Sequence, residues 1–286
     1  MGIVVRDLIS RKIIFYLKGA DSAVKTKVNS LDCNFIEEES ENLAKDGLRT
    51  LTFTQKVLSE KEFEDWDNKM KEAGKDYKFR EEKEELCVEA LESNMSFLGI
   101  SGVEDLLQEK IKEVIESLRS AGIKLWMITG DKLETAKCIA ISTGLKKSTE
   151  RFFELKDFND SAEFKMRLDE FERNPNDAII IEGSTLAKVV STTGTYDNSS
   201  AKALEERFLK ISSLAPCVIC CRCSPNQKEA ITKGLKLLNG KGVAGIGDGG
   251  NDVGMIQSAN VGIGIEGKEG KQAALCSDFS ILKFMD

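Results

Sequence analysis

The chain has 286 residues, of which 41% are hydrophobic and 31% are charged, and this composition suits one large or two ordinary globular domains with apolar cores. Its net charge of −7 argues against nucleic acid as a partner, because a polyanion is repelled unless a local basic patch overrides that charge. The absence of histidine excludes Ser-His-Asp triads, imidazole bases and His-ligated zinc, so any chemistry must rest on carboxylates, lysines, arginines and the backbone.

The first part of the chain is predicted to form a hairpin and solvent-facing helices. Residues 3–5 and 12–17 are β-rich runs around a polar turn at 7–11, which is typical of an antiparallel hairpin. Between residues 37 and 92 glutamate and lysine dominate and apolar residues are sparse, which predicts solvent-facing helices with a strand near 48–53. We find no pattern of residues in this region that is typical of a catalytic site.

From about residue 95, helices and strands alternate. A helical repeat of apolar residues ends at Gly122, after which a buried strand at 123–128 and a helix at 132–143 are predicted. Ser224, Pro225 and Gln227 supply a capping serine, a first-turn proline and a capping-box glutamine, so a helix is expected to run to about residue 238. Further buried strands are expected at 178–181, 218–221, 243–246 and 261–265. This alternation predicts an α/β fold with a mainly parallel sheet.

Two loops that follow predicted strands carry groups suited to phosphate and a hard cation. Ligands bind beyond the carboxyl ends of parallel strands, where both Thr129-Gly130-Asp131 and the loop 247–252 are placed. The first loop precedes a helix whose free N–H groups attract phosphate. In the second, Asp248 and Asp252 can bind a cation through oxygen and Asn251 can hydrogen-bond a phosphoryl oxygen. Lys228 adds a positive charge, so we predict a magnesium and phosphate site.

Each of these features has a simpler interpretation on its own. Thr-Gly-Asp is common at turns, and a single lysine such as Lys228 is usually a solvated helix residue, so the prediction depends on their occurring together. Gly245, Gly247 and Gly250 also match the dinucleotide-binding fingerprint. That alternative is disfavoured, because it would set two carboxylates beside a pyrophosphate that the fingerprint binds without metal.

The eight cysteines lack the spacing that is typical of small disulfide-rich domains. We therefore predict reduced thiols rather than a disulfide framework. Cys217, Cys220, Cys221 and Cys223 suggest zinc, yet on a continuous strand Cys220 faces away from the other three. Buried strand cysteines are therefore favoured. No run approaches the ~18 apolar residues of a membrane helix, and residues 1–11 lack the apolar core of a signal peptide, so we expect a soluble segment.

Six stretches of the chain resemble motifs of the P-type ATPases, and their sequences are similar to those of the phospholipid-transporting, or flippase, subclass. In chain order they are FYLKGAD (15–21), GLRTLTF (47–53), GVEDLLQ (102–108), AGIKLWMITGDKLETA (121–136), CCRCSPNQK (220–228) and IGDGGNDVGMIQSANVGIGIEGKEGKQA (246–273). The resemblance implies the C-terminal part of an α+β nucleotide-binding domain at 1–95. It implies a haloacid-dehalogenase-like phosphorylation domain at 96–286, with a variable stretch near 146–213. Gly250 departs mildly from the family, in which alanine is common there.

The resemblance also implies roles for individual residues, with ATP and Mg²⁺ as cofactors. The implied nucleotide-binding residues are Lys18, Gly19, Arg49, Thr129, Gly130, Asp131, Arg222, Lys228, Asn251 and Asp252. Among these, Lys18 would line the adenine pocket and Arg49 would reach the nucleotide phosphates, roles for which the sequence alone offers little support. Lys228 would neutralise the transferred phosphoryl group. Asp248 and Asp252 would bind the metal.

Family members form an aspartyl phosphate within an Asp-Lys-Thr-Gly-Thr motif, and no such string occurs in this sequence. The resemblance therefore suggests a truncated piece that is inactive alone, and loss of the central strand carrying that motif would leave neighbouring strands with unpaired edges. The intact protein would work at the cytosolic face of a membrane, contact phospholipid through segments outside this chain, and could take an accessory subunit. Two alternatives stay open, a non-catalytic nucleotide- or partner-binding module and a magnesium-dependent phosphatase. The phosphatase would need a nucleophilic aspartate after a buried strand, which we do not find.

Overall fold

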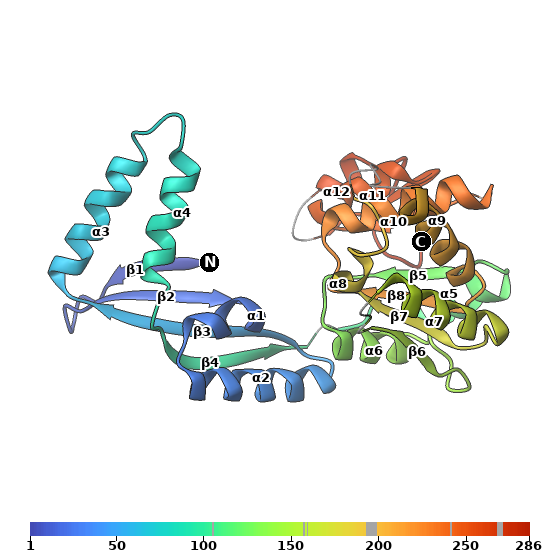
Figure 1. Cartoon of the computed structure of the whole chain (residues 1–286), viewed down its shortest axis with the longest axis horizontal. Coiled ribbons are helices and arrows are strands. Elements are labelled where there is room, and N and C mark those ends of the chain that lie inside the picture. Colours follow the sequence, from blue (N-terminus) through green and yellow to red (C-terminus); the bar gives the residue numbers. More distant parts are fainter. Residues whose placement is uncertain (105, 157, 159, 193–198, 241, 268–270) are drawn as a thin grey trace. The chain divides into compact units, whose positions relative to one another are not determined.

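The computed structural model describes residues 1–104, 106–156, 158, 160–192, 199–240, 242–267 and 271–286. Residues 268–270 of the last motif and several residues of the variable stretch lie outside this description. The chain divides into two compact units, unit 1 (Met1–Asp105) and unit 2 (Leu106–Asp286) (Figure 1). In the part of the chain that is described, no helix combines the length and the apolar character needed to cross a membrane.

Unit 1 is built on an antiparallel sheet in the order β1-β2-β3-β4. Its strands are β1 (Gly2–Arg6), β2 (Ile13–Gly19), β3 (Arg49–Leu58) and β4 (Ser96–Val103). The predicted hairpin is confirmed as β1–β2, and the strand near 48–53 is confirmed as part of a longer β3. The boundary expected at 95/96 precedes β4, which pairs with β3 and so lies within unit 1.

The helices of unit 1 cover one face of this sheet. They are α1 (Asp21–Val24), the 3-10 helix η1 (Lys25–Lys27), α2 (Ser30–Lys45), α3 (Glu60–Ala73) and α4 (Arg80–Leu91). A capping box at Ser59 and Glu62 begins α3. Along β2, Ile13, Phe15 and Leu17 alternate toward the helices and are buried in one apolar cluster. The alternate side chains of β2, those of Ile14, Tyr16 and Lys18, point to the opposite face.

Unit 2 is an α/β structure with two parallel sheets, ordered β5-β8-β7-β6 and β11-β10-β9. Its strands are β5 (Leu125–Ile128), β6 (Phe152–Leu155), β7 (Ala178–Glu182), β8 (Cys217–Cys221), β9 (Ala244–Gly247), β10 (Val261–Ile265) and β11 (Phe279–Ile281). Its helices are α5 (Ile111–Ser120), α6 (Leu133–Ser142), α7 (Ser161–Arg173), α8 (Gly183–Leu186), α9 (Ser199–Ser212), α10 (Pro225–Asn239), η2 (Gly250–Asp252), α11 (Val253–Ser258) and α12 (Gln272–Leu275). The predicted α/β class with mainly parallel strands and flanking helices is confirmed.

Both faces of the four-stranded sheet are buried, which explains the unbroken apolar runs of β7 and β8. One face packs against α7 and α9 through a cluster that includes Phe164 and Phe208. The other packs against α5 and α6 through Ile115 and Ala136. Because successive strand residues alternate between these two clusters, the sheet is held from both sides and its carboxyl edge is a rigid support.

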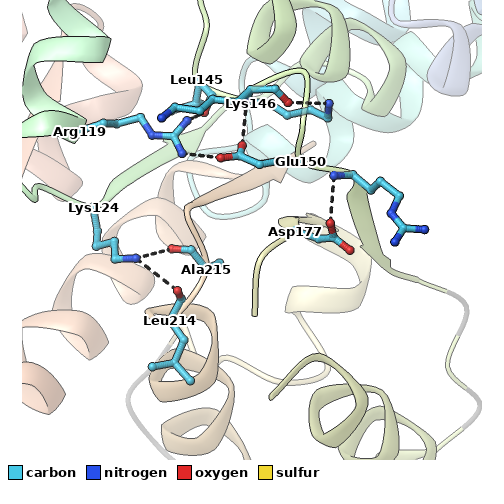
Figure 2. Close-up of polar contacts among 10 residues, drawn as sticks. Arg119, Lys124, Leu145, Lys146, Glu150, Asp177, Leu214 and Ala215 are labelled. Carbon is cyan, nitrogen blue, oxygen red and sulfur yellow. Dashed lines mark hydrogen bonds and ion pairs between the residues drawn. The ribbon is translucent and has the colours of Figure 1, made fainter. Parts of the chain in front are cut away.

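Polar contacts fix the opposite edge of this sheet, where the strands begin (Figure 2). Arg119 at the end of α5 forms a largely buried ion pair with Glu150, at 2.6 Å, just before β6. Lys124 donates hydrogen bonds to the main-chain oxygens of Leu214 and Ala215, at 3.2 and 3.0 Å. These contacts join loops that enter different strands, so they stabilise the order of the sheet away from the predicted site.

Candidate phosphoryl and metal site

At the carboxyl edge, the predicted phosphate loop and the Cys-Arg-Cys segment are joined through their main chains. The Thr129 N–H donates to Cys220 O at 2.8 Å, and the Cys223 N–H donates back to Thr129 O at 2.9 Å. The Arg222 N–H donates to Asp131 O, also at 2.9 Å. The turn after β5 and the turn after β8 therefore form one connected surface. Thr129, Asp131 and the exposed Arg222, all predicted site residues, are brought together there.

The phosphate loop is also ordered within itself. The Thr129 hydroxyl donates to Asp131 Oδ2 at 2.8 Å and accepts the Asp131 N–H at 3.1 Å. Gly130 is exposed between them, and α6 begins two residues after Asp131. The turn thus presents a glycine main chain and a helix N-terminus outward, and both suit a phosphate oxygen.

Lys228 lies in the first turn of α10, whose start is fixed by the predicted capping box. The Ser224 hydroxyl accepts the Gln227 N–H, and the Gln227 side chain accepts the Ser224 N–H at 2.9 Å. This cap sets the direction in which the helix leaves β8. It places the Lys228 ammonium next to the acidic loop, with only 7% of the lysine side chain exposed.

Lys228 and Asp252 form a buried ion pair, with 2.8 Å between Nζ and Oδ1 and 9% of the Asp252 side chain exposed. The other carboxylate oxygen of Asp252 accepts the Gly249 N–H at 3.3 Å. The loop can close this tightly because residue 247 is glycine: a Cβ there would lie 2.4 Å from the Asp252 Cβ. The pair brings together two predicted site residues that are 24 positions apart.

Asp248 and Asn251, also predicted site residues, are exposed on the same loop. Among the described residues, no group of three or more cysteine, aspartate or glutamate side chains is placed to hold a metal. A magnesium ion typically uses only one or two protein carboxylates and completes its shell with water and substrate phosphates. The all-oxygen donor set of this loop fits that pattern, with Asp248 accessible and Asp252 already engaged by Lys228.

The third group of predicted residues lies in unit 1. Lys18 on β2 is directly opposite Phe53 on β3, and Gly19 is opposite Thr52. Since alternate residues of a strand share a face, Arg49 lies on the same face as Phe53 and therefore as Lys18. Lys18 and Arg49 are both exposed at the same end of the sheet. The register thus places on one face two residues that were assigned to nucleotide only by resemblance.

One contact at the site was not foreseen from the sequence. Gln227, besides closing the cap, donates from Nε2 to the Gly183 main-chain oxygen at 2.7 Å. A Cβ on Gly183 would lie 2.2 Å from the Arg222 oxygen, so only glycine fits between β7 and the turn after β8. The capping pattern revealed the local role of Gln227. Its second partner is 44 residues away and could be found only in the folded chain.

The predicted orientation of Cys223 is wrong. Cys217 and Cys221 do face one core and Cys220 the other, but Cys223 lies on the side of Cys220. The reason is Arg222, whose φ of 52° is left-handed, so that the strand alternation ends there. The prediction that all four cysteines are buried is confirmed.

The sequence is similar to those of known proteins. The family described as "P-type ATPase, cytoplasmic domain N" matches residues 10–110. A probable phospholipid-transporting ATPase IIB of Homo sapiens is 43% identical over 284 residues, which cover 99% of this chain and 24% of that protein. The chain is a relative of the phospholipid-transporting P-type ATPases. Phospholipid-transporting ATPase NEO1 of Saccharomyces cerevisiae is 39% identical over 285 residues, covering 99% of this chain and 24% of NEO1.

Phospholipid-transporting ATPase 11C of Mus musculus is 35% identical over 310 aligned positions, which cover 99% of this chain and 27% of that protein. The chain thus spans about a quarter of the length of the P-type ATPases it matches, and the similarity extends through both units. All six sequence motifs lie within the aligned length. The roles of individual residues in this P-type ATPase relative stay predictions.

Proposed function

We propose that this chain binds ATP and Mg²⁺ and holds the phosphoryl group during its transfer to an aspartate, as the nucleotide and phosphorylation region of an ATP-driven phospholipid flippase. The buried Lys228–Asp252 pair carries this proposal. This lysine is held in place and shielded from water beside an acidic glycine-rich loop. It is therefore suited to offset the negative charge of a phosphoryl group during its transfer.

The phosphoryl chemistry would be shared among three parts of the site. Lys228 has three N–H donors, of which Asp252 takes one, so the others can bind phosphoryl oxygens. Thr129 and Gly130 would contact the same group from the turn after β5. Asp248, with Asp252, would hold Mg²⁺, which when bound neutralises phosphate charge. Asp252 keeps Lys228 oriented, and burial of both charges reduces screening by water.

The aspartate nucleophile is proposed to lie on a further parallel strand between β5 and β9. In the described residues these two strands are the ends of their sheets, and each runs directly into one of the two phosphate loops. A strand placed between them would pair with both edges and present its carboxyl end to both loops. Because the sequence holds no Asp-Lys-Thr-Gly string, we expect the 286-residue chain alone to form no acid-stable phosphoenzyme. Radiolabel retained in acid after incubation with γ-labelled ATP would contradict this.

Nucleotide binding is proposed to use the exposed face of unit 1 that carries Lys18 and Arg49. The test is calorimetric titration of the chain with Mg²⁺ and ATP. Lys18→Ala is expected to weaken affinity roughly tenfold or more, because a hydrogen bond to a charged group is worth about 1.5–3 kcal/mol. Lys12→Ala is the matched control, since it removes the same charge from an exposed residue just before β2. Equal affinities for all three proteins would refute this use of the face.

In this proposal the lipid is moved by other segments of the intact protein, and the two units work at the cytosolic face of the membrane. The relatives' names supply the lipid substrate, and the residues described here supply only the nucleotide and phosphoryl chemistry. The proposal therefore assigns no lipid selectivity to either unit. An accessory subunit, if one is used, would be found with the intact protein.

A further inference from the structure

Cys220 and Cys223 form a thiol pair at the edge of the phosphoryl site. Cys220 is the penultimate residue of β8, and the left-handed turn at Arg222 brings Cys223 back to the same side of the sheet. Both side chains belong to one apolar cluster, and the Cys223 thiol donates a hydrogen bond to the Cys221 main-chain oxygen at 3.7 Å. Cys220 is fully buried, whereas Cys223 is 7% exposed. The two thiols thus lie on the same side of the sheet, and one of them is near the surface.

The surroundings of the two thiols differ in a way that assigns them different chemistry. Cys223 immediately precedes Ser224, the N-cap of α10, so it lies at the positive end of a 15-residue helix. A hydrogen bond from the Cys220 thiol and the nearby charge of Lys228 lower the pKa of Cys223. The same hydrogen bond and full burial raise the pKa of Cys220. A helix N-terminus, a lysine and a Cys-x-x-Cys spacing are the conditions that favour a reactive thiolate.

We propose that Cys220 and Cys223 are a redox-reactive pair that hydrogen peroxide converts to a disulfide. The Cys223 thiolate attacks one peroxide oxygen, the O–O bond breaks, and sulfenic acid and hydroxide form. The Cys220 thiol then attacks the sulfenic sulfur, the S–O bond breaks, and the hydroxyl leaves as water after taking up a proton. Overall, two thiols lose two electrons and two protons, and one peroxide becomes two waters.

The disulfide would act on the phosphoryl site through the main chain. A disulfide holds its two Cα atoms about 4.4–6.8 Å apart, which constrains the turn between them. Cys223 donates its N–H to Thr129, and Lys228 follows in the first turn of the adjoining helix. Oxidation would therefore constrain the segment that joins Thr129 to Lys228. This inference is independent of nucleotide binding.

Peptide mapping of the 286-residue chain tests the pair directly. The chain is treated with hydrogen peroxide, its remaining thiols are alkylated in denaturant, and it is digested without reduction. Trypsin cuts after Arg222, so the proposed disulfide would link peptide 211–222 to peptide 223–228. We expect these linked peptides to appear before any other cysteine is oxidised, and to disappear when dithiothreitol is added. Tandem fragmentation should show that the disulfide in peptide 211–222 is at Cys220.

Matched variants separate this pair from the other thiols. Cys221→Ala should keep the linked peptides, because Cys221 faces the other core, whereas Cys220→Ala should abolish them. The proposal is overturned if Cys220 and Cys223 stay reduced, and so are found alkylated, while Cys33 or Cys276 is oxidised. Both of these other cysteines are only partly buried. The proposal is also overturned if Cys220→Ala leaves the linked peptides unchanged. Should a variant fail to fold, the peptide map of the parent chain decides by itself, and neither result bears on the affinity for ATP.

Discussion

Removal of the Lys228 charge is the most direct test of the buried pair at the site. In Lys228→Met the Asp252 carboxylate would stay in a position where only 9% of its side chain is exposed, with the Gly249 N–H as its remaining described partner. Breaking a buried ion pair from one side typically costs roughly 3–5 kcal/mol. With a urea m value of about 2 kcal/mol/M, the midpoint of unfolding should fall by roughly 1.5–2.5 M.

The assay can be confined to the unit that contains the pair. The chain has two tryptophans, Trp66 in unit 1 and Trp126 on β5 in unit 2. In a Trp66→Phe background, urea unfolding followed by fluorescence therefore reports unit 2 alone. Lys233→Met is the matched control on the same helix, because its ion pair with Glu229 is exposed and should be worth about 0.5 kcal/mol or less.

A double-mutant cycle separates the pair from the loss of a long side chain. Lys228→Met combined with Asp252→Asn removes both charges, so the double variant should be much less destabilised than the sum of the single variants. Single losses that add within about 0.5 kcal/mol would show that the two charges do not interact. A Lys228→Met cost equal to that of Lys233→Met would refute the burial argument itself.

Three further changes test local contacts within unit 2. Gly183→Ala should lower the thermal midpoint clearly, because the added Cβ would lie 2.2 Å from a main-chain oxygen, whereas Gly242→Ala meets nothing within 4 Å and should be nearly neutral. Ser224→Ala should cost about 1 kcal/mol in urea unfolding through loss of the cap. Hydrogen bonds, first from Lys137, lower the pKa of Glu154 below its ordinary value of 4.5. The Glu154 carboxylate therefore contributes to the stability of the folded state above pH 4.5, and this contribution is lost as the pH falls through the lowered pKa. Glu154→Gln should therefore destabilise at neutral pH and match the parent in strong acid; an equal difference at both would contradict this.

Several elements could be predicted from short stretches of sequence because their causes are local. The start of α10 follows from Ser224, Pro225 and Gln227, each of which acts on backbone groups within one turn. Strands β7 and β8 follow from apolar runs, since a parallel strand covered on both faces has no polar side. The loop of Asp248 and Asp252 could be identified because glycines and carboxylates directly after a strand are rarely needed for a turn alone.

Other features depended on partners far away in the chain. The expected boundary at 95/96 preceded β4, because only pairing with β3 shows where that strand belongs. Cys223 was assigned to the wrong face, because periodicity assumes that a strand continues and cannot detect the left-handed residue Arg222. That the parallel strands fall into two sheets likewise follows from hydrogen-bond pairing, which no single strand encodes.

The sequence by itself determined the α/β class, the buried strands, the cap of α10 and the candidate chemistry of the glycine-rich loop, because these depend on neighbours within a few residues. Only the tertiary structure decided that the Lys228 ammonium pairs with the Asp252 carboxylate, that Lys18 and Arg49 share a face, and that Cys220 and Cys223 face the same core. Such meetings are set by strand register, by the helix direction that packing imposes and by single backbone torsions, and none of these leaves a periodic signal in the sequence.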